Sequence, residues 1–161
     1  HLSSQATEGR PKVRYLEVAD RVWPLTRRVM GLHTLLYQAT GGRIGRHIPG
    51  VGRMLLLDHV GARTGTKRTS PLLYTPDGDD LVIVASKGGY PKHPAWYHNL
   101  VANPDTTIQV GSERRPVHAR VATAEERERL WPMVVATYRG YDVYQARSQG
   151  REIPLVILEP S

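Results

Sequence analysis

The sequence predicts an α+β fold that is mainly β, in which a small antiparallel barrel carries helices on its periphery. Six short apolar segments are separated by turn residues, a pattern typical of a meander that closes on itself. Helical periodicity occurs before the first segment and again after the fifth. The length fits a single domain, 1–161, with a basic helical segment at 1–50 and a barrel core at 51–161.

The composition excludes several kinds of site. The chain has no cysteine, so disulfides, thiolate metal centres, iron–sulfur clusters and cysteine nucleophiles are excluded. The longest apolar runs, such as Met54–Leu57, extend over only four or five residues. A membrane-spanning helix needs roughly 20 such residues. We therefore expect a cytoplasmic protein without a transmembrane segment.

The net charge favours an anionic partner. Basic residues outnumber acidic ones by 22 to 15, which gives a charge of +7 and a pI of about 10.0. Residues 1–50 hold eight basic and three acidic side chains, so most of the excess lies in that segment. Nucleic acid, an anionic lipid surface and a phosphorylated or polycarboxylate ligand are the candidate partners.

The first predicted element is an amphipathic helix that begins after Pro24, a residue suited to a first helical turn. Its apolar residues recur at helical spacing, at Leu25, Val29, Leu32 and Leu36. Gly41-Gly42 is a stop signal beyond them. Two compatible interpretations follow: the helix covers one end of the barrel, or it is a basic anchor that rests on a membrane surface.

The strands follow in the middle of the chain, in segments rich in Val, Ile, Leu and Thr. The predicted strands are Met54–His59, Ser70–Tyr74, Leu81–Ala85, Thr106–Val110, Val117–Val121 and Ile153–Leu158. Asp77-Gly78, between the second and third strands, is the clearest hairpin turn.

Two further helices complete the prediction. A short helix is expected over Pro94–Asn103. Thr123, followed three residues later by Glu126, fits a capping box, and apolar periodicity then continues to Tyr141. Pro132 is expected to kink or restart this helix.

The first group of candidate functional residues is a glycine-bearing turn, Gly61–Arg68, between two predicted strands. It carries Arg63, Lys67 and Arg68 within six residues, and glycines let backbone N–H groups line a concavity for a phosphate. The spacing is not that of a Walker loop. A solvated basic hairpin tip is the alternative.

The second group lies at the end of the third predicted strand, Ala85–Gly89. A small hydroxyl at Ser86, a cation at Lys87 and two glycines make a rim that a planar ligand can approach closely. Trp96, further along the chain, packs either in the core or against a cofactor. His93 and His98 have no third partner at metal-ligand spacing, so no metal site is predicted.

The third group is formed by Tyr138, Tyr141 and Tyr144, spaced by threes. On a helix such residues share a face, and each offers a broad ring and a hydroxyl that can donate a hydrogen bond. Since the chain has no Phe, aromatic packing is the alternative role for these residues.

In this order and at these separations, the groups resemble the deazaflavin-dependent nitroreductase and quinone reductase family, whose members are split-barrel proteins that use reduced coenzyme F-420. The resemblance extends from about Leu25 to Pro160. The motifs that carry it are Gly61-Ala62-Arg63-Thr64-Gly65, Ala85-Ser86-Lys87-Gly88-Gly89, Pro94–Leu100, Ala102-Asn103-Pro104, Trp131-Pro132, the three tyrosines and Ile153–Val156.

The resemblance implies a split β-barrel of the FMN-binding-like type and hydride transfer from reduced coenzyme F-420 to a hydrophobic, electron-poor acceptor, either a quinone or a nitroaromatic. It also implies cofactor contacts for Arg63, Thr64, Gly65, Arg68, Pro71, Ala85, Ser86, Lys87, Gly88 and Trp96. The basic residues among them would meet the phosphate and acidic tail. It places the three tyrosines on the substrate side, with Tyr138 or Tyr141 as proton donor and Ser86 as the rival.

Two other functions stay open. A split-barrel flavoprotein that binds FMN is the first alternative, and a basic nucleic-acid-binding module is the second. The second is disfavoured because the basic turn and the tyrosines lie far apart in the chain and no nucleic-acid motif is present. We therefore expect no nucleic-acid partner, and a peripheral contact of the N-terminal segment with the inner face of the plasma membrane.

Overall fold

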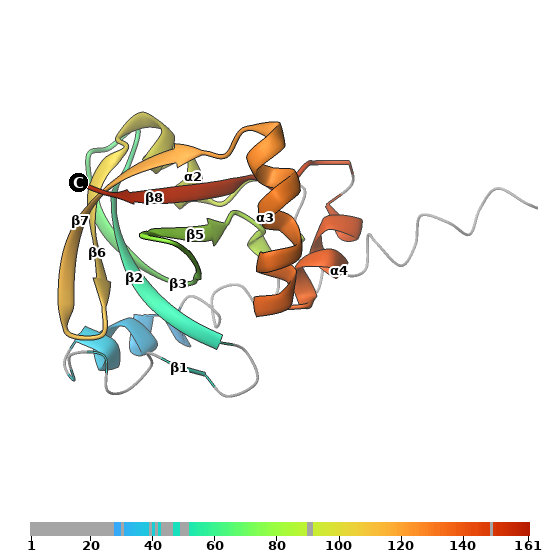
Figure 1. The fold of residues 1–161 in the computed structure, drawn as a ribbon. Coiled ribbons are helices and arrows are strands. Elements are labelled where there is room, and N and C mark those ends of the chain that lie inside the picture. Colours follow the sequence, from blue (N-terminus) through green and yellow to red (C-terminus); the bar gives the residue numbers. More distant parts are fainter. Residues whose placement is uncertain are drawn as a thin grey trace, which may run out of the picture.

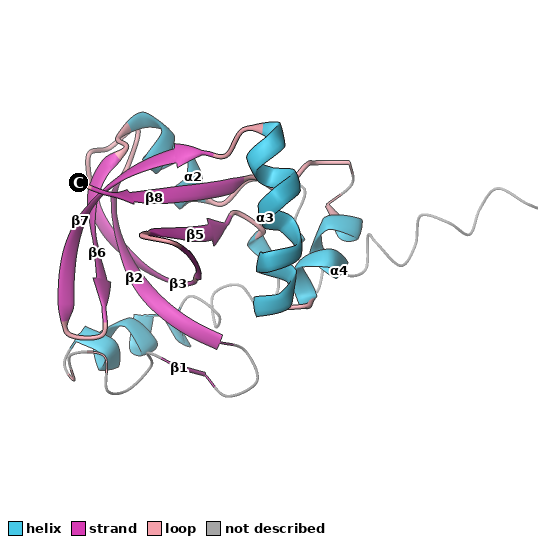
Figure 2. Cartoon of the chain, viewed as in Figure 1, coloured by secondary structure: helices cyan, strands magenta, loops and turns pink. Residues whose placement is uncertain are grey.

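The computed structural model describes residues 28–29, 31–38, 40, 42, 47–48, 52–89, 92–148 and 150–161. Their strands form a curled, antiparallel sheet with helices on its outside (Figures 1 and 2). The predicted split barrel with peripheral helices is therefore confirmed. Most of the basic segment 1–50 lies outside the described residues.

The sheet contains more strand than the sequence predicts. Its strands are β1 (His47–Ile48), β2 (Gly52–Val60), β3 (Lys67–Leu73), β4 (Thr75–Asp77), β5 (Asp80–Val84), β6 (Asp105–Val110), β7 (Glu113–Val121) and β8 (Leu155–Pro160). The order is β1-β2-β6-β7-β8-β5-β4, and β3 also pairs with β2. The six predicted strands are present with shifted bounds, whereas β1 and β4 were missed because each is very short.

Alternating side chains of β5 separate two cores. Leu81 and Ile83 belong to the cluster inside the barrel, which also holds Trp96. Val82 and Val84 point the other way, into a second cluster beneath the outer helices. Since successive residues of a strand face opposite sides of the sheet, burial on both sides requires an unbroken apolar run. This is the reason that the segment showed no alternation of polar and apolar residues.

The helices are α2 (Ala95–Ala102), α3 (Ala124–Thr137) and α4 (Gly140–Arg147), with a short 3-10 turn, η1, at Lys87–Gly89. Figure 1 shows α3 and α4 together on one side of the sheet, next to β5 and β8. The predicted capping box is confirmed, because Thr123 Oγ1 accepts from Glu126 N at 3.3 Å and Glu126 Oε1 accepts from Thr123 N at 3.1 Å. Arg120 on β7 also donates two hydrogen bonds to Glu126, at 2.6 and 2.7 Å. These contacts lower the pKa of Glu126 to about 2.

The predicted restart of the helix at Pro132 is wrong, and so is its continuation through Tyr138 to Tyr141, whereas a kink at Pro132 stays a prediction. α3 continues through Pro132 to Thr137, and the break comes at Tyr138, whose backbone is extended at φ −148° and ψ 106°. Pro132 lies inside α3, although it cannot donate a backbone hydrogen bond. Tyr138 therefore does not share a helix with Tyr141 and Tyr144, which belong to α4.

The N-terminal helix contacts the barrel through a residue outside the predicted stripe. Residues 28–29 and 31–38 are helical, and Tyr37 is fully buried, with its hydroxyl accepting from Gly111 N at 2.7 Å. Val29, Leu32 and Leu36 of the predicted stripe are instead 58%, 59% and 39% exposed, Leu35 beside them is 64% exposed, and Leu25 lies outside the described residues. The helix does cover part of the barrel, as one interpretation expected, but its apolar stripe faces away from it.

Candidate functional site

The basic turn between β2 and β3 is a compact, exposed loop. Gly61 N donates to Thr66 O and Gly65 N donates to Gly61 O, both at 2.9 Å. Gly65 has a φ of +68°, a conformation that glycine adopts without strain. Within the described residues, the N–H groups of Arg63 and Thr64 have no hydrogen-bond acceptor. The turn therefore presents free backbone donors, as an anion site requires.

The cations of this turn are exposed and carry a surplus of positive charge. In the described part of the chain, no ion pair joins Arg63, Lys67 or Arg68 to a carboxylate. Asp58, the acid closest to them along β2, is bonded to Arg114 at 2.6 Å instead. A phosphate or a carboxylate bound at the turn would thus meet cations that no acidic side chain has already neutralised.

A buried amide on α2 holds the turn in place. Asn99 Oδ1 accepts from Ala62 N at 2.9 Å, so its Nδ2 faces His59 Nδ1, also at 2.9 Å. His59 Nδ1 is then the acceptor, and Nε2–H donates to Ser70 Oγ at 2.9 Å. Burial, followed by the charge of Arg68, lowers the pKa of His59, which favours this neutral form.

Sequence reasoning assigned no function to Asn99 or His59. Asn99 stands inside one of the motifs quoted above, yet its spacing does not show which backbone group its amide meets. Both residues are buried, at 7% and 5% exposure, and Asn99 reaches the turn and His59 only after β2 and α2 have packed together.

The second group, Ala85–Gly89, lies where β5 leaves the sheet. Ala85 N donates to Pro154 O at 3.0 Å, which is the last hydrogen bond at this end of the β5–β8 pair. The chain then forms η1. Lys87 has a φ of +46°, a conformation that is uncommon for a residue with a side chain and often found at functional sites. Ser86 and Lys87 are both half-buried, so this group has less contact with solvent than the basic turn.

A glycine brings this strand end against the tyrosines. A Cβ atom added to Gly89 would lie 2.7 Å from Tyr144 O and 2.8 Å from Tyr144 Cα, distances that no side chain tolerates. Only glycine therefore lets η1 and α4 approach this closely. The second and third groups of predicted site residues consequently lie next to each other.

The three tyrosines pack on one another in edge-to-face and tilted contacts, with ring centroids between 5.1 and 6.3 Å apart. Tyr138 Oη and Tyr144 Oη are hydrogen-bonded at 3.1 Å, and both side chains are half-buried. Tyr141 is buried in the core under α3, and this burial, reinforced by the other two tyrosines, raises the pKa of its hydroxyl. The accessible pair is therefore Tyr138 and Tyr144.

Two predicted cofactor contacts lie deeper than the rest. Trp96 is 7% exposed and belongs to the cluster inside the barrel. Pro71 is buried in β3, opposite Leu56 of β2. Both residues pack within the fold, so a contact with a ligand would be limited to an edge.

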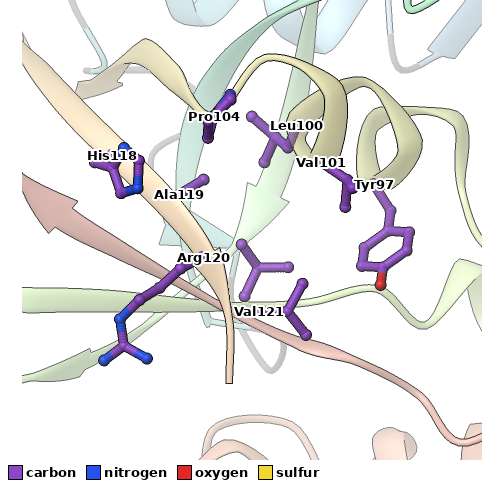
Figure 3. A pocket seen from close by; sticks show the side chains of 9 residues that line it. Tyr97, Leu100, Val101, Pro104, His118, Ala119, Arg120 and Val121 are labelled. Carbon is purple, nitrogen blue, oxygen red and sulfur yellow. The ribbon is translucent and has the colours of Figure 1, made fainter. Parts of the chain in front are cut away.

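A groove of about 250 Å³ lies elsewhere, between α2 and β7 (Figure 3). It is lined by Tyr97, Leu100, Val101, Pro104, His118, Ala119, Arg120, Val121 and Val156. None of the predicted cofactor or substrate residues lines it. Among the described residues, no three His, Asp or Glu side chains gather to hold a metal ion.

Comparison with known proteins identifies relatives that match most of the chain. The model of the family described as F420H(2)-dependent quinone reductase matches residues 29–160. An F420H(2)-dependent quinone reductase of Mycobacterium tuberculosis (strain ATCC 25618 / H37Rv) is 46% identical over 134 residues, which cover 81% of this chain and 89% of that protein.

Solved structures agree with the sequence comparison. An F420-H2 dependent reductase, FDR-A, has a TM-score of 0.61 and 41% identity, over 66% of this chain and 93% of its own. A chain described as a domain-swapped dimer has a TM-score of 0.64 and 37% identity, over 88% of this chain and 98% of its own.

Proposed function

The chain belongs to the F420H(2)-dependent quinone reductase family, and we propose that it is an oxidoreductase that uses reduced coenzyme F-420 to reduce a hydrophobic quinone. The observation that supports this most is the junction at Gly89, where the turn bearing Ser86 and Lys87 meets the tyrosine cluster. A cofactor ring and an acceptor must lie in contact for hydride transfer, and this junction places their proposed binding residues together.

The charge and chemistry of the described residues support cofactor binding. The exposed cations Arg63 and Arg68, with Thr64 and Gly65, would hold the phosphate and the acidic tail. Lys87 would add a cation near the ring, while Ala85, Ser86 and Gly88 would offer backbone and a hydroxyl to its edge. Pro71 and Trp96 would support this face from within the fold.

The protein's own residues orient the acceptor and supply a proton. When bound, the reduced deazaflavin supplies a hydride from its C5 atom. Tyr138 Oη is half-buried and hydrogen-bonded to Tyr144 Oη, so it can donate to an acceptor oxygen while the second hydroxyl supports it. Ser86 is the other candidate donor. Tyr141 is better suited to hold the other two rings, because its own ring is in the core.

The proposed acceptor is hydrophobic, and a hydrophobic quinone would reside in a membrane. The N-terminal helix has features that support a contact of this protein with a membrane surface. Val29, Leu32 and Leu35 form an exposed apolar surface beside Arg28. Apolar side chains next to a cation are typical of helices that lie on an anionic membrane. No helix among the described residues is long and apolar enough to span a bilayer. The proposed contact is peripheral, through the exposed apolar side chains of the N-terminal helix and Arg28.

Binding and turnover assays test the proposal. Titration with oxidised F-420 is expected to change the cofactor's fluorescence in a saturable way, and Arg63→Ala and Lys87→Ala should each weaken this binding. F-420H2 should be reoxidised when menadione is added, and a nitroimidazole in the same assay tests nitroaromatic acceptors. A purified protein that is yellow with a flavin spectrum and does not bind F-420 would overturn the proposal in favour of an FMN protein.

A further inference from the structure

Arg151, in the loop between α4 and β8, reaches the strand end that carries Ser86 and Lys87. Its Nη1 donates to Ala85 O at 3.0 Å, and its Nη2 donates to Ser86 O at 2.8 Å. Nη1 also lies 2.9 Å from His93 Nδ1. One guanidinium thus joins two successive carbonyls of the turn to the segment that precedes α2.

The turn that Arg151 contacts needs support from outside. Beyond Ala85 N the strand makes no further ladder bond with β8, and Lys87 follows at a φ of +46°. Such a conformation is unfavourable for a residue with a side chain and persists only where the surroundings fix it. Within the turn, Gly89 N donates to Ser86 O at 3.0 Å. Arg151 adds charge-assisted bonds to that same oxygen and to the one before it.

Arg151 is itself held by buried and half-buried partners. Ser148 Oγ donates to Arg151 O at 2.6 Å, and Gln145 Nε2 donates to the same oxygen at 2.8 Å. Ser148 is fully buried, and Gln145 Oε1 also accepts from Ile153 N at 2.9 Å. The backbone at Arg151 is therefore hydrogen-bonded to Gln145 of the tyrosine-bearing helix and to Ser148 just after it.

We propose that Arg151 is a positioning residue of the cofactor-ring site: it holds the carbonyls of Ala85 and Ser86 so that Ser86 and Lys87 face the ring beside the tyrosines. This inference rests on the proposed function. Arginine suits the task because its planar fork donates in two directions at once, whereas lysine offers a single, freely rotating ammonium. Arg151 acts through the turn and is not assigned a contact with the ring.

The test compares two probes that share a ring. Coenzyme F-420 carries the phosphate and acidic tail, and 8-hydroxy-5-deazariboflavin lacks both. Arg151→Met should weaken binding of both probes by about the same factor, roughly tenfold for the loss of two charged hydrogen bonds. Arg151→Lys should weaken both to a smaller extent. Arg63→Ala, in contrast, should weaken binding of F-420 alone.

Arg129→Met is the matched control. Arg129, on α3, also donates two hydrogen bonds, to Asp77 at 3.2 and 3.0 Å, but Asp77 lies at the β4–β5 hairpin, at the end of β5 opposite to Ala85. All variants are compared at a temperature where thermal melting shows them fully folded, and Arg151→Lys serves if Arg151→Met does not fold. Unchanged Kd for the deazariboflavin in a folded Arg151 variant would overturn the inference, whatever its melting temperature. Failure of the wild-type protein to bind F-420 would instead overturn the proposed function.

Discussion

The basic turn at 61–68 and the strand end at 85–89 belong to the same proposed cofactor site, yet they are built in opposite ways. The turn is exposed, and its cations reach into solvent from a loop held by one buried amide, Asn99. The strand end is half-buried, strained at Lys87 and packed backbone to backbone against α4.

This difference indicates what each region recognises. Exposed cations on a turn attract any flexible anion, and their contribution depends on charge more than on exact position. A strand end packed against aromatic side chains requires a fixed shape, because a displacement of about 1 Å is costly for hydride transfer. We therefore expect changes at the turn to affect affinity for the tail and changes at the strand end to affect the ring and the reaction.

The largest effect is expected for Gly89→Ala. Its Cβ would collide with Tyr144 O, and its φ of +79° is unfavourable for alanine. Moving η1 away from α4 should lower kcat by on the order of a hundredfold, the scale associated with misplaced reacting groups. Steady-state kinetics with F-420H2 and menadione measures this loss.

Gly78→Ala is the control for backbone strain alone. Gly78 also has a positive φ, +60°, but no atom lies within 4 Å of its added Cβ. Gly78→Ala should lower the free energy of unfolding by about 1–2 kcal/mol and leave kcat unchanged. Equal kcat losses in the two variants would show that the junction at Gly89 has no special role.

A smaller effect is expected from removing single tyrosine hydroxyls. Tyr138→Phe should lower kcat with menadione by at least tenfold, since a general acid contributes on the order of a hundredfold or more. Tyr141→Phe should change kcat by less than about threefold, because the ring remains in the core and the hydroxyl has no assigned chemical role. A larger loss for Tyr141→Phe than for Tyr138→Phe would reverse the assignment.

Asn99→Leu tests the support of the basic turn. The change leaves Ala62 N and His59 Nδ1 without their partner, and an unsatisfied buried polar group costs about 1–3 kcal/mol. Urea denaturation should show this loss of stability. Binding of F-420 should weaken by up to tenfold, while binding of 8-hydroxy-5-deazariboflavin should be unchanged. His98→Ala, on the exposed side of the same helix, should alter neither quantity.

The smallest effect is a pH dependence that originates at His59. Its pKa is lowered in the folded protein from the ordinary value of 6.5. The unfolded chain therefore binds the proton more readily, so stability is fully present above pH 6.5 and is lost as pH falls below it. Urea denaturation across this range should show the decline, and His59→Gln should reduce it. A stability that does not depend on pH in the wild-type protein between pH 7 and 5 would contradict this prediction.

Local patterns were sufficient for most of the fold. Apolar runs such as Leu81–Ala85 and the Thr123–Glu126 capping box depend on neighbours within a few residues, and the structure confirms them. A restart was expected at Pro132 because proline is a strong local signal, whereas the helix ends at Tyr138, where no such local signal stands. Tyr138 packs its ring against Gly140, where an added Cβ would lie 2.6 Å from the ring.

The N-terminal apolar stripe shows what a sequence pattern leaves undetermined. Its helical period was correct over the described residues, but periodicity shows which residues share a face and not what that face contacts. The contact with the barrel is made by Tyr37, whose hydroxyl partners are Met54 O, Gln109 O and Gly111 N. No spacing in the sequence relates these positions.

The sequence by itself determined the family, the barrel and the three groups of residues proposed to form the site, because each rests on short-range patterns in a specific order. Only the tertiary structure decided how these groups are joined. Asn99 reaches the basic turn across 37 positions, and Arg151 reaches Ala85 across 66. Such contacts exist only once strands and helices distant in the chain have packed, since a hydrogen bond requires two atoms within about 3 Å and sequence order does not specify that distance.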